Sequence, residues 1–251
     1  MVSKLNLESK VIVGSGDVVE ESHASPTTTC RTDLMNSFAG DTAKPATLSS
    51  VVLVDSGGTE RDSASIATGD WTLTSITNGY RATCTKTISI TANYTIAKVR
   101  LYGGTSLYFE YTLASGINVT TGSQVTVSIQ IDATWSISHT SGGTLVSADV
   151  STYFGRTVLN RLCLGTEKGK KLNTVQLVYQ GGTVTYFTGT ISTDTPNIRL
   201  TLNASYTPAN DTTIDEYDYS LDDLTVLVMI KIQAVTLGGG LTHTWTYTVN
   251  F

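Results

Sequence analysis

Strict alternation between apolar and small polar residues constrains the fold of this 251-residue chain more than any other feature. The pattern covers residues 80–90, 125–132 and 241–249, where apolar side chains alternate with Thr, Ser or other polar residues. Successive side chains of a β-strand point to opposite faces of a sheet, so a period of two predicts half-buried strands. Gly-Gly, Asn-Gly and Ser-Gly pairs between such segments are typical of hairpin turns. We therefore predict an all-β protein built from antiparallel β-sandwiches.

Composition agrees with this fold class and excludes some partners. The chain contains 44 Thr and 25 Ser, and Thr favours strands. Only 15% of its residues are charged, against about 25% in a typical soluble domain. The formal net charge is -5 and the sequence pI is about 5.1, so the overall field repels phosphate. Nucleic acid is therefore not an expected partner.

An internal repeat is the second constraint. The strand-like segment 51–59, VVLVDSGGT, returns 124 residues later as VQLVYQGGT at 175–183. The same offset places Leu34 on Val158 upstream. Further along, ANYT at 92–95 matches ASYT at 204–207, and 107–132 matches 224–249. The segment 184–191 is the expected second-copy counterpart of 80–90. The ordered series predicts a tandem duplication with loops of different length.

The repeat divides the chain into four parts. We predict an extended N-terminal arm at 1–29, a first β-sandwich unit at 30–136, a Ser/Gly/Thr-rich linker at 137–152 and a second unit at 153–251.

Two helices and the arm complete the expected architecture. Short helices are expected at 32–38, with Asp33 as a candidate cap, and at 157–164. The arm alternates as a strand does but has no core of its own, so it needs a strand to pair with. Either it covers an edge of its own sandwich, or it adds to a neighbouring subunit.

One segment looks like a catalytic motif. Residues 52–57, VLVDSG, resemble the strand-and-turn of aspartic proteases, whose chemistry needs two carboxylates that share a proton. The second copy has Tyr179, Gln180 and Gly181 where Asp55, Ser56 and Gly57 stand in the first. Because no second carboxylate exists within the chain, a strand-ending turn is the better interpretation. We predict no catalytic residue and no enzyme.

Charged clusters offer weak binding-site candidates. The loop 165–171, GTEKGKK, has one residue too few between its glycines for a phosphate-binding Walker motif, so a solvated loop is expected. Six acids between 211 and 223 could supply oxygen ligands for Ca²⁺, but a solvated loop before an apolar strand explains them equally. These acids are Asp211, Asp215, Glu216, Asp218, Asp222 and Asp223. No metal or cofactor is predicted.

Histidines, cysteines and aromatic residues are assigned mainly to structure. His23, His139 and His243 are far apart, and no Ser-His-Asp order emerges. The three cysteines have no paired spacing, and we expect buried free thiols. They are Cys30, Cys84 and Cys163. Trp71, Trp135 and Trp245, together with 12 Tyr, fill cores and interfaces or form a platform for stacking sugars.

Residues 33–132, and through the repeat the degenerate second copy, also carry a family resemblance. Its segments are LMNSFAG at 34–40, KP at 44–45, LSSVVLVDSGGT at 48–59 and DS at 62–63. In this order they resemble modules in structural proteins of tailed viruses, which have a short helix, a K-P turn and a Gly-rich strand ending in G-T. Asp55 and Ser56 depart from the small residues usual there. No functional residue can be carried over.

Taken together, these features predict a non-enzymatic structural protein of a virion, located on the capsid surface or in the tail or fibre. Its expected partners are copies of itself and other virion proteins, with no nucleic acid and no membrane. The start of the chain lacks a signal-peptide pattern, so synthesis in the host cytoplasm is expected. Two alternatives stay open. One is a carbohydrate-binding or adhesin module for host-surface glycans, and the other is a self-assembling extracellular tube or filament subunit that donates its arm.

Overall fold

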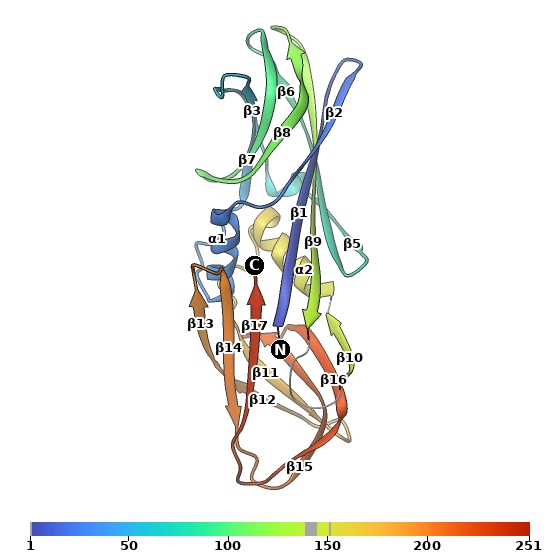
Figure 1. Cartoon of the computed structure of the whole chain (residues 1–251), viewed down its shortest axis with the longest axis vertical. Coiled ribbons are helices and arrows are strands. Elements are labelled where there is room, and N and C mark those ends of the chain that lie inside the picture. Colours follow the sequence, from blue (N-terminus) through green and yellow to red (C-terminus); the bar gives the residue numbers. More distant parts are fainter. Residues whose placement is uncertain (1, 139–144, 151) are drawn as a thin grey trace.

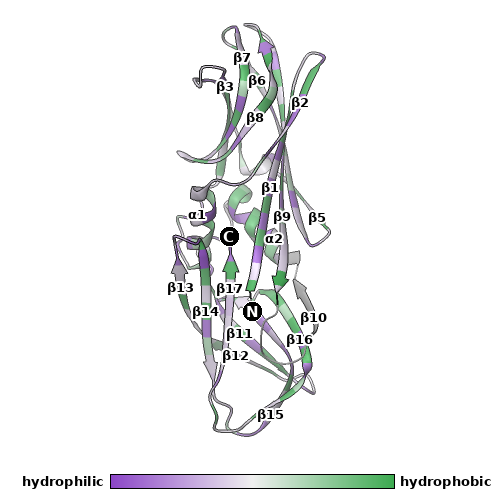
Figure 2. Cartoon of the chain, in the orientation of Figure 1, coloured by the Kyte–Doolittle hydropathy of each residue, from purple (hydrophilic) through white to green (hydrophobic). Residues whose placement is uncertain are grey.

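The computed structural model describes residues 2–138, 145–150 and 152–251. Strands make up 62% of the chain and helices 11%, which confirms the all-β class. The molecule is elongated, with strands above and below a waist that holds the helices (Figure 1). Hydrophobic and hydrophilic residues alternate along strands of both halves (Figure 2), as the period of two predicted.

One large sheet runs through both halves of the molecule (Figure 1). Its neighbouring strands, in order, are β13 (Thr190–Asp194), β14 (Arg199–Tyr206), β17 (His243–Asn250), β1 (Val2–Ser15), β9 (Gln124–Ser138), β6 (Gly79–Ser89) and β5 (Thr72–Ile76). An eighth strand, β2 (Val18–Ala24), pairs with the second half of β1. All the predicted alternating segments therefore lie in this sheet.

Two smaller antiparallel sheets each pack against one half of the large sheet. The four-stranded sheet has the order β4 (Glu60–Ser65), β3 (Leu48–Asp55), β7 (Tyr94–Gly103) and β8 (Ser106–Val119). The five-stranded sheet has the order β12 (Val184–Thr188), β11 (Leu172–Tyr179), β15 (Thr212–Leu221), β16 (Val226–Leu237) and β10 (Leu145–Val150). The buried apolar residues of both sandwiches join into one continuous core. β10 lies within the stretch that was expected to be a linker.

The two predicted helices are present at the waist (Figure 1), and the chain also has a short 3-10 turn, η1 (Thr68–Asp70). α1 spans Thr28–Phe38, and α2 (Thr152–Leu159) continues into a π-helical turn, η2 (Asn160–Leu164). Asp33 is not the cap of α1, because the helix begins earlier and the hydroxyl of Thr27 accepts the Cys30 N–H instead. Asp33 is buried and accepts hydrogen bonds from Tyr108 Oη at 2.7 Å and Lys44 Nζ at 3.1 Å.

The N-terminal segment is a central strand and not an arm outside the units. β1 pairs in parallel with β17 and antiparallel with β9, both in the same chain. Leu5, Leu7, Val11 and Val13 alternate into the core, and the last two are fully buried. The alternation of this segment was read correctly, but β9 and β17 lie more than 100 residues away in the sequence, so the sequence could not place the segment at the centre of a sheet.

Part of the repeat alignment is also corrected. The segment 184–191, expected to match the strand at 80–90, breaks at Gly189, where the chain passes from the five-stranded sheet to the large one. A Cβ at Gly189 would lie 2.5 Å from the Asn203 carbonyl oxygen, so only glycine fits this crossing. The ANYT and ASYT segments are not equivalent either, since one begins β7 and the other ends β14.

Candidate interaction face

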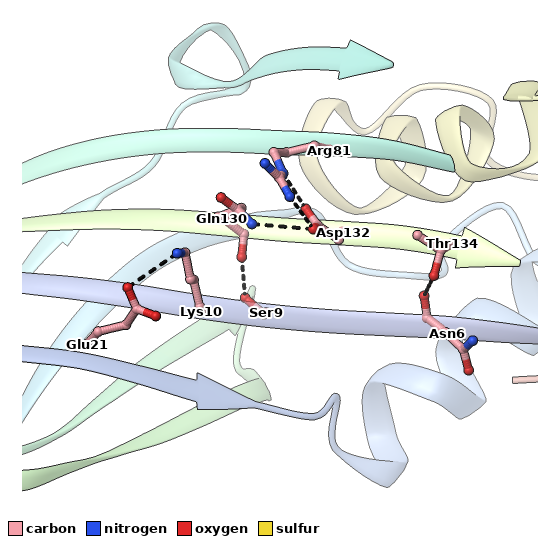
Figure 3. A network of polar contacts seen from close by, with 8 residues as sticks. All are labelled: Asn6, Ser9, Lys10, Glu21, Arg81, Gln130, Asp132 and Thr134. Atoms are coloured by element: carbon pink, nitrogen blue, oxygen red, sulfur yellow. Dashed lines mark hydrogen bonds and ion pairs between the residues drawn. The ribbon is translucent and has the colours of Figure 1, made fainter. Parts of the chain in front are cut away.

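A polar network covers the outer face of the large sheet across four strands, β2, β1, β9 and β6 (Figure 3). The odd-numbered residues of β1 from Leu5 to Val13 point into the core, so the even-numbered ones point outward. Three of these, Asn6, Glu8 and Lys10, lie beside outward residues of β9. The face is therefore a direct product of the strand alternation.

An Arg–Asp pair forms the centre of this network. Arg81 on β6 donates from Nε and Nη2 to the two carboxylate oxygens of Asp132 on β9, both at 2.7 Å. This two-bond geometry raises the pKa of Arg81. Gln130 lies beside the pair (Figure 3). The pair joins two neighbouring strands across the sheet, and each charge neutralises the other.

A second group of charges lies where β2 meets β1. Glu21 accepts from His23 Nε2 at 3.0 Å and from Lys10 Nζ at 3.2 Å. These hydrogen bonds, the one from His23 being the larger cause, lower the pKa of Glu21. Further along the face the hydroxyls of Thr85 and Ser128 are 3.2 Å apart. A broad sheet face with mutually paired charges and hydroxyls suits contact with another surface, since few ions need to be desolvated without a partner.

Asp55 of the protease-like motif is a turn residue. Its Oδ1 accepts backbone N–H groups from Gly57 at 2.9 Å and Thr59 at 2.8 Å, and Arg61 Nε lies 2.6 Å from its Oδ2. These contacts, the one from Thr59 being the largest cause, lower its pKa. The geometry agrees with the predicted strand-ending turn, in which the carboxylate fixes the β3–β4 connection.

The lysine-rich loop 165–171 is a packed joint, contrary to the expectation of a solvated loop. Lys168 Nζ donates to Thr47 Oγ1 at 2.8 Å, and Lys170 pairs with Asp223 at 2.6 Å. A Cβ on Gly169 would lie 2.5 Å from Thr42, so the loop and the segment 40–47 are in close contact. The segment 40–47, against which the loop packs, is far away in the sequence. The composition of the loop alone therefore suggested exposure.

The acidic cluster does not form one loop. Asp215, Glu216 and Asp218 lie within strand β15, and Asp211 Oδ1 accepts the Gly239 N–H at 2.7 Å. In the described part of the chain, no three His, Cys, Asp or Glu side chains come together in a way that could hold a metal ion. Neighbouring strand residues point to opposite faces, which separates Asp215 from Glu216, and Asp218 is buried whereas Glu216 is only partly buried.

Asp218 is a buried carboxyl group that sequence reasoning did not single out from its acidic neighbours. Its residue is 2% exposed, and its Oδ1 has no hydrogen-bond partner in the described structure. Burial, and secondarily the nearby Glu216, raise its pKa to about 7, while Lys231 opposes this. The apolar segment 224–230, which follows Asp218, was the sequence feature that could have indicated a buried hairpin here.

Replacing Asp218 with Asn is expected to stabilise the protein by about 2 kcal/mol at pH 8, because the folded state no longer holds a desolvated carboxylate. In the native protein the folded pKa of Asp218 lies above that of the unfolded chain, which is about 4. The free energy of unfolding therefore falls as the pH rises from about 4 to 7, and the contribution of Asp218 is constant above that. Urea unfolding at several pH values measures the effect, with Asp215→Asn as control. If the stability of Asp218→Asn had the same pH dependence as that of the native protein, the burial of Asp218 would be contradicted.

The cysteines are buried free thiols, as predicted. Burial raises the pKa of all three, that of Cys84 to about 11. Of the histidines, His23 lies on β2 and His243 on β17, and His139 lies outside the described residues.

The tryptophans do not form one platform. Trp71 and Trp135 are each 7% exposed, so neither offers a face to a sugar. Trp245 is half-buried and packs on Phe187, which stacks on Tyr206 with ring centroids 5.4 Å apart. This cluster of Phe187, Tyr206 and Trp245 is the aromatic group in the described structure that combines stacking with partial exposure.

Arg161 is a second residue that sequence reasoning missed. It is fully buried in η2, and its guanidinium lies 3.8 Å from the centre of the Phe38 ring. It donates to Ser37 Oγ and to the Lys170 carbonyl, both at 2.9 Å. Burial lowers its pKa to about 10, so it stays charged at neutral pH. The contacts join the first and second halves of the chain at the waist.

The chain matches no protein-family model, and no curated protein or solved structure matches it either. Among the described helices, none has the length and apolar character needed to cross a membrane.

Proposed function

We propose that this protein is a non-enzymatic structural subunit of a virion, on the capsid surface or in the tail or fibre, that assembles with copies of itself. The observation that carries the proposal is the single large sheet that runs through both halves, with β1 between β9 and β17. A strand from the N-terminus thereby ties the last strand of the chain to the first half. The result is a stiff, elongated body, which suits a load-bearing part of an assembly.

An ancestral duplication is part of this proposal. α1 begins at Thr28 and α2 at Thr152, and β3 and β11 span Leu48–Asp55 and Leu172–Tyr179, each pair 124 residues apart. The turns that follow have the same bonds, from Asp55 N to the Thr59 carbonyl and from Tyr179 N to the Thr183 carbonyl. A β-module copied within one gene gives two similar sandwiches.

The order of the two smaller sheets supports the same interpretation. β4-β3-β7-β8 in one corresponds to β12-β11-β15-β16 in the other. In addition, the segment 40–47 and the loop 165–171, which correspond at the 124-residue offset, pack on each other at the waist. A duplicated module in which equivalent loops meet is expected when two copies fuse about an approximate two-fold axis.

Assembly is expected to involve the free edges of the large sheet, β5 and β13. Purified protein should form a closed oligomer or a lattice by mass measurement and negative-stain imaging. Thr74→Lys on β5 should weaken assembly, because an edge lysine opposes strand pairing, whereas Thr201→Lys on β14, which is paired on both sides, should not. A protein that stays monomeric at high concentration would contradict the proposal.

Carbohydrate binding is a second candidate function, and the half-buried Trp245 cluster favours it. Aromatic faces stack on the apolar faces of sugars. Binding of the monomer to a glycan array, lost in Trp245→Ala, would support this function in place of assembly.

A further inference from the structure

The large sheet has a gap one strand wide beside β1. On the side of β1 away from β9, β17 pairs with Val2–Lys4 and β2 pairs with Ser9–Ser15. Among the residues that the structure describes, no strand pairs with residues 5–8 on this side. At about 3.3 Å per residue, the interruption is about 13 Å long.

The two flanking strands have structural reasons to stop. After Ala24 the chain turns away through Pro26, and Thr27 is held on β8 by its N–H to the Tyr108 carbonyl at 2.9 Å. At the other flank, Phe251 donates its N–H to the Ile198 carbonyl and packs against Phe38. Neither neighbouring segment pairs as a strand with residues 5–8.

The backbone of β1 points polar groups into this gap. Asn6 directs its carbonyl toward β9, where Thr134 Oγ1 donates to it at 3.5 Å (Figure 3). Backbone groups of successive strand residues point to opposite sides, so Leu7 directs its N–H and C=O away from β9. Leu7 lies between the last residue paired with β17 and the first paired with β2. Its backbone groups are therefore available for an added strand.

A groove of about 290 Å³ lies at the same place. It is lined by Lys4, Leu5, Asn6, Leu7, Glu8, Ser25, Pro26, Arg31 and Phe251. Cationic side chains outnumber the single acidic one, and Arg31 Nε is buried with no hydrogen-bond partner in the described structure. Arg31 lines the groove, and the guanidinium of an arginine pairs favourably with a carboxylate ligand.

We propose that this gap binds an extended segment of a partner protein, which adds a short strand beside Leu7 and places an Asp or Glu side chain on Arg31. Main-chain hydrogen bonds to a sheet edge give affinity in this type of recognition, and side-chain contacts give specificity. The inference goes beyond the proposed function, because such a site would bind its partner whether or not the protein assembles into a particle.

The test uses the full chain and the acetylated, amidated peptide Thr-Val-Asp-Val-Thr. Hydrogen exchange followed by NMR is expected to show a fast Leu7 amide in the free protein and a slower one with millimolar peptide. A peptide with the central amide N-methylated should bind about tenfold more weakly, because it lacks one ladder hydrogen bond. Replacing the aspartate of the peptide by lysine should have at least as large an effect.

Variants of the protein separate the two contacts. Arg31→Gln should weaken peptide binding about tenfold, and Arg31→Lys should recover part of the loss. Lys231→Gln on the five-stranded sheet is the matched control and should bind as the native protein does. Thermal melts establish that all variants fold.

Three results would overturn the proposal. The first is a Leu7 amide whose exchange is unchanged by peptide, and the second is equal binding of the N-methylated peptide. The third is protection of Leu7 in protein alone that grows with concentration, because a second copy would then occupy the gap.

Discussion

Val11→Asp is expected to lower the free energy of unfolding by about 4 kcal/mol or more. Val11 is fully buried in β1, between Ile129 of β9 and Ser22 of β2. A carboxylate at this position has no cationic partner to compensate for its desolvation. Urea unfolding followed by circular dichroism measures the loss, and poor soluble expression is the expected result if stability falls below what folding requires.

Lys10→Ala provides the matched control on the neighbouring residue. Lys10 points to the outer face and pairs with Glu21 at 3.2 Å, and such surface pairs contribute about 1 kcal/mol or less. If Val11→Asp and Lys10→Ala had the same urea midpoint, β1 would not be an interior strand of the sheet. The pair of variants therefore tests the central position of the N-terminal segment directly.

Arg161→Ala is expected to destabilise the protein by about 3 kcal/mol. The substitution leaves a cavity beside Phe38 and removes the donors that now satisfy Ser37 Oγ and the Lys170 carbonyl. Because these contacts join the two halves at the waist, both sandwiches should lose stability together. Thermal unfolding monitored by tyrosine and tryptophan fluorescence measures the change.

Arg161→Met distinguishes packing from charge at this position. An apolar side chain of similar length fills most of the space and avoids burying a charge, although Ser37 Oγ and the Lys170 carbonyl lose the same donors as in Arg161→Ala. We expect Arg161→Met to lie within about 1 kcal/mol of the native protein. Equal losses of stability in Arg161→Ala and Arg161→Met would assign the stabilisation to the hydrogen bonds. If neither variant lost stability, Arg161 would not stabilise the waist.

Particular elements explain how far the sequence alone could go. The strands β6, β9 and β17 were predicted because each has one buried and one polar face, a pattern with a local cause. The equivalence of 51–59 and 175–183 was visible for the same reason, since the turn after each strand needs the same glycines. The crossing at Gly189 was missed because glycine is required there by contact with Asn203, which is distant in sequence.

The candidate site was harder to predict than the fold. Asp55 could be assigned to a turn because its partners are within six residues. Arg161 and Asp218 could not be recognised as buried, because their environments are formed by segments from other parts of the chain. The gap beside Leu7 could not be recognised either, since it exists only where β17 ends and β2 begins on the same edge of β1.

The sequence by itself determined the all-β class, the alternating faces of the strands, the short helices and the buried thiols, because each depends on spacing along a few neighbouring residues. Only the tertiary structure decided that the N-terminal segment lies between β9 and β17 and so unites both sandwiches in one sheet. The physical reason is that a strand's alternation fixes which side chains face the core, whereas the choice of its neighbours depends on the packing of the whole chain.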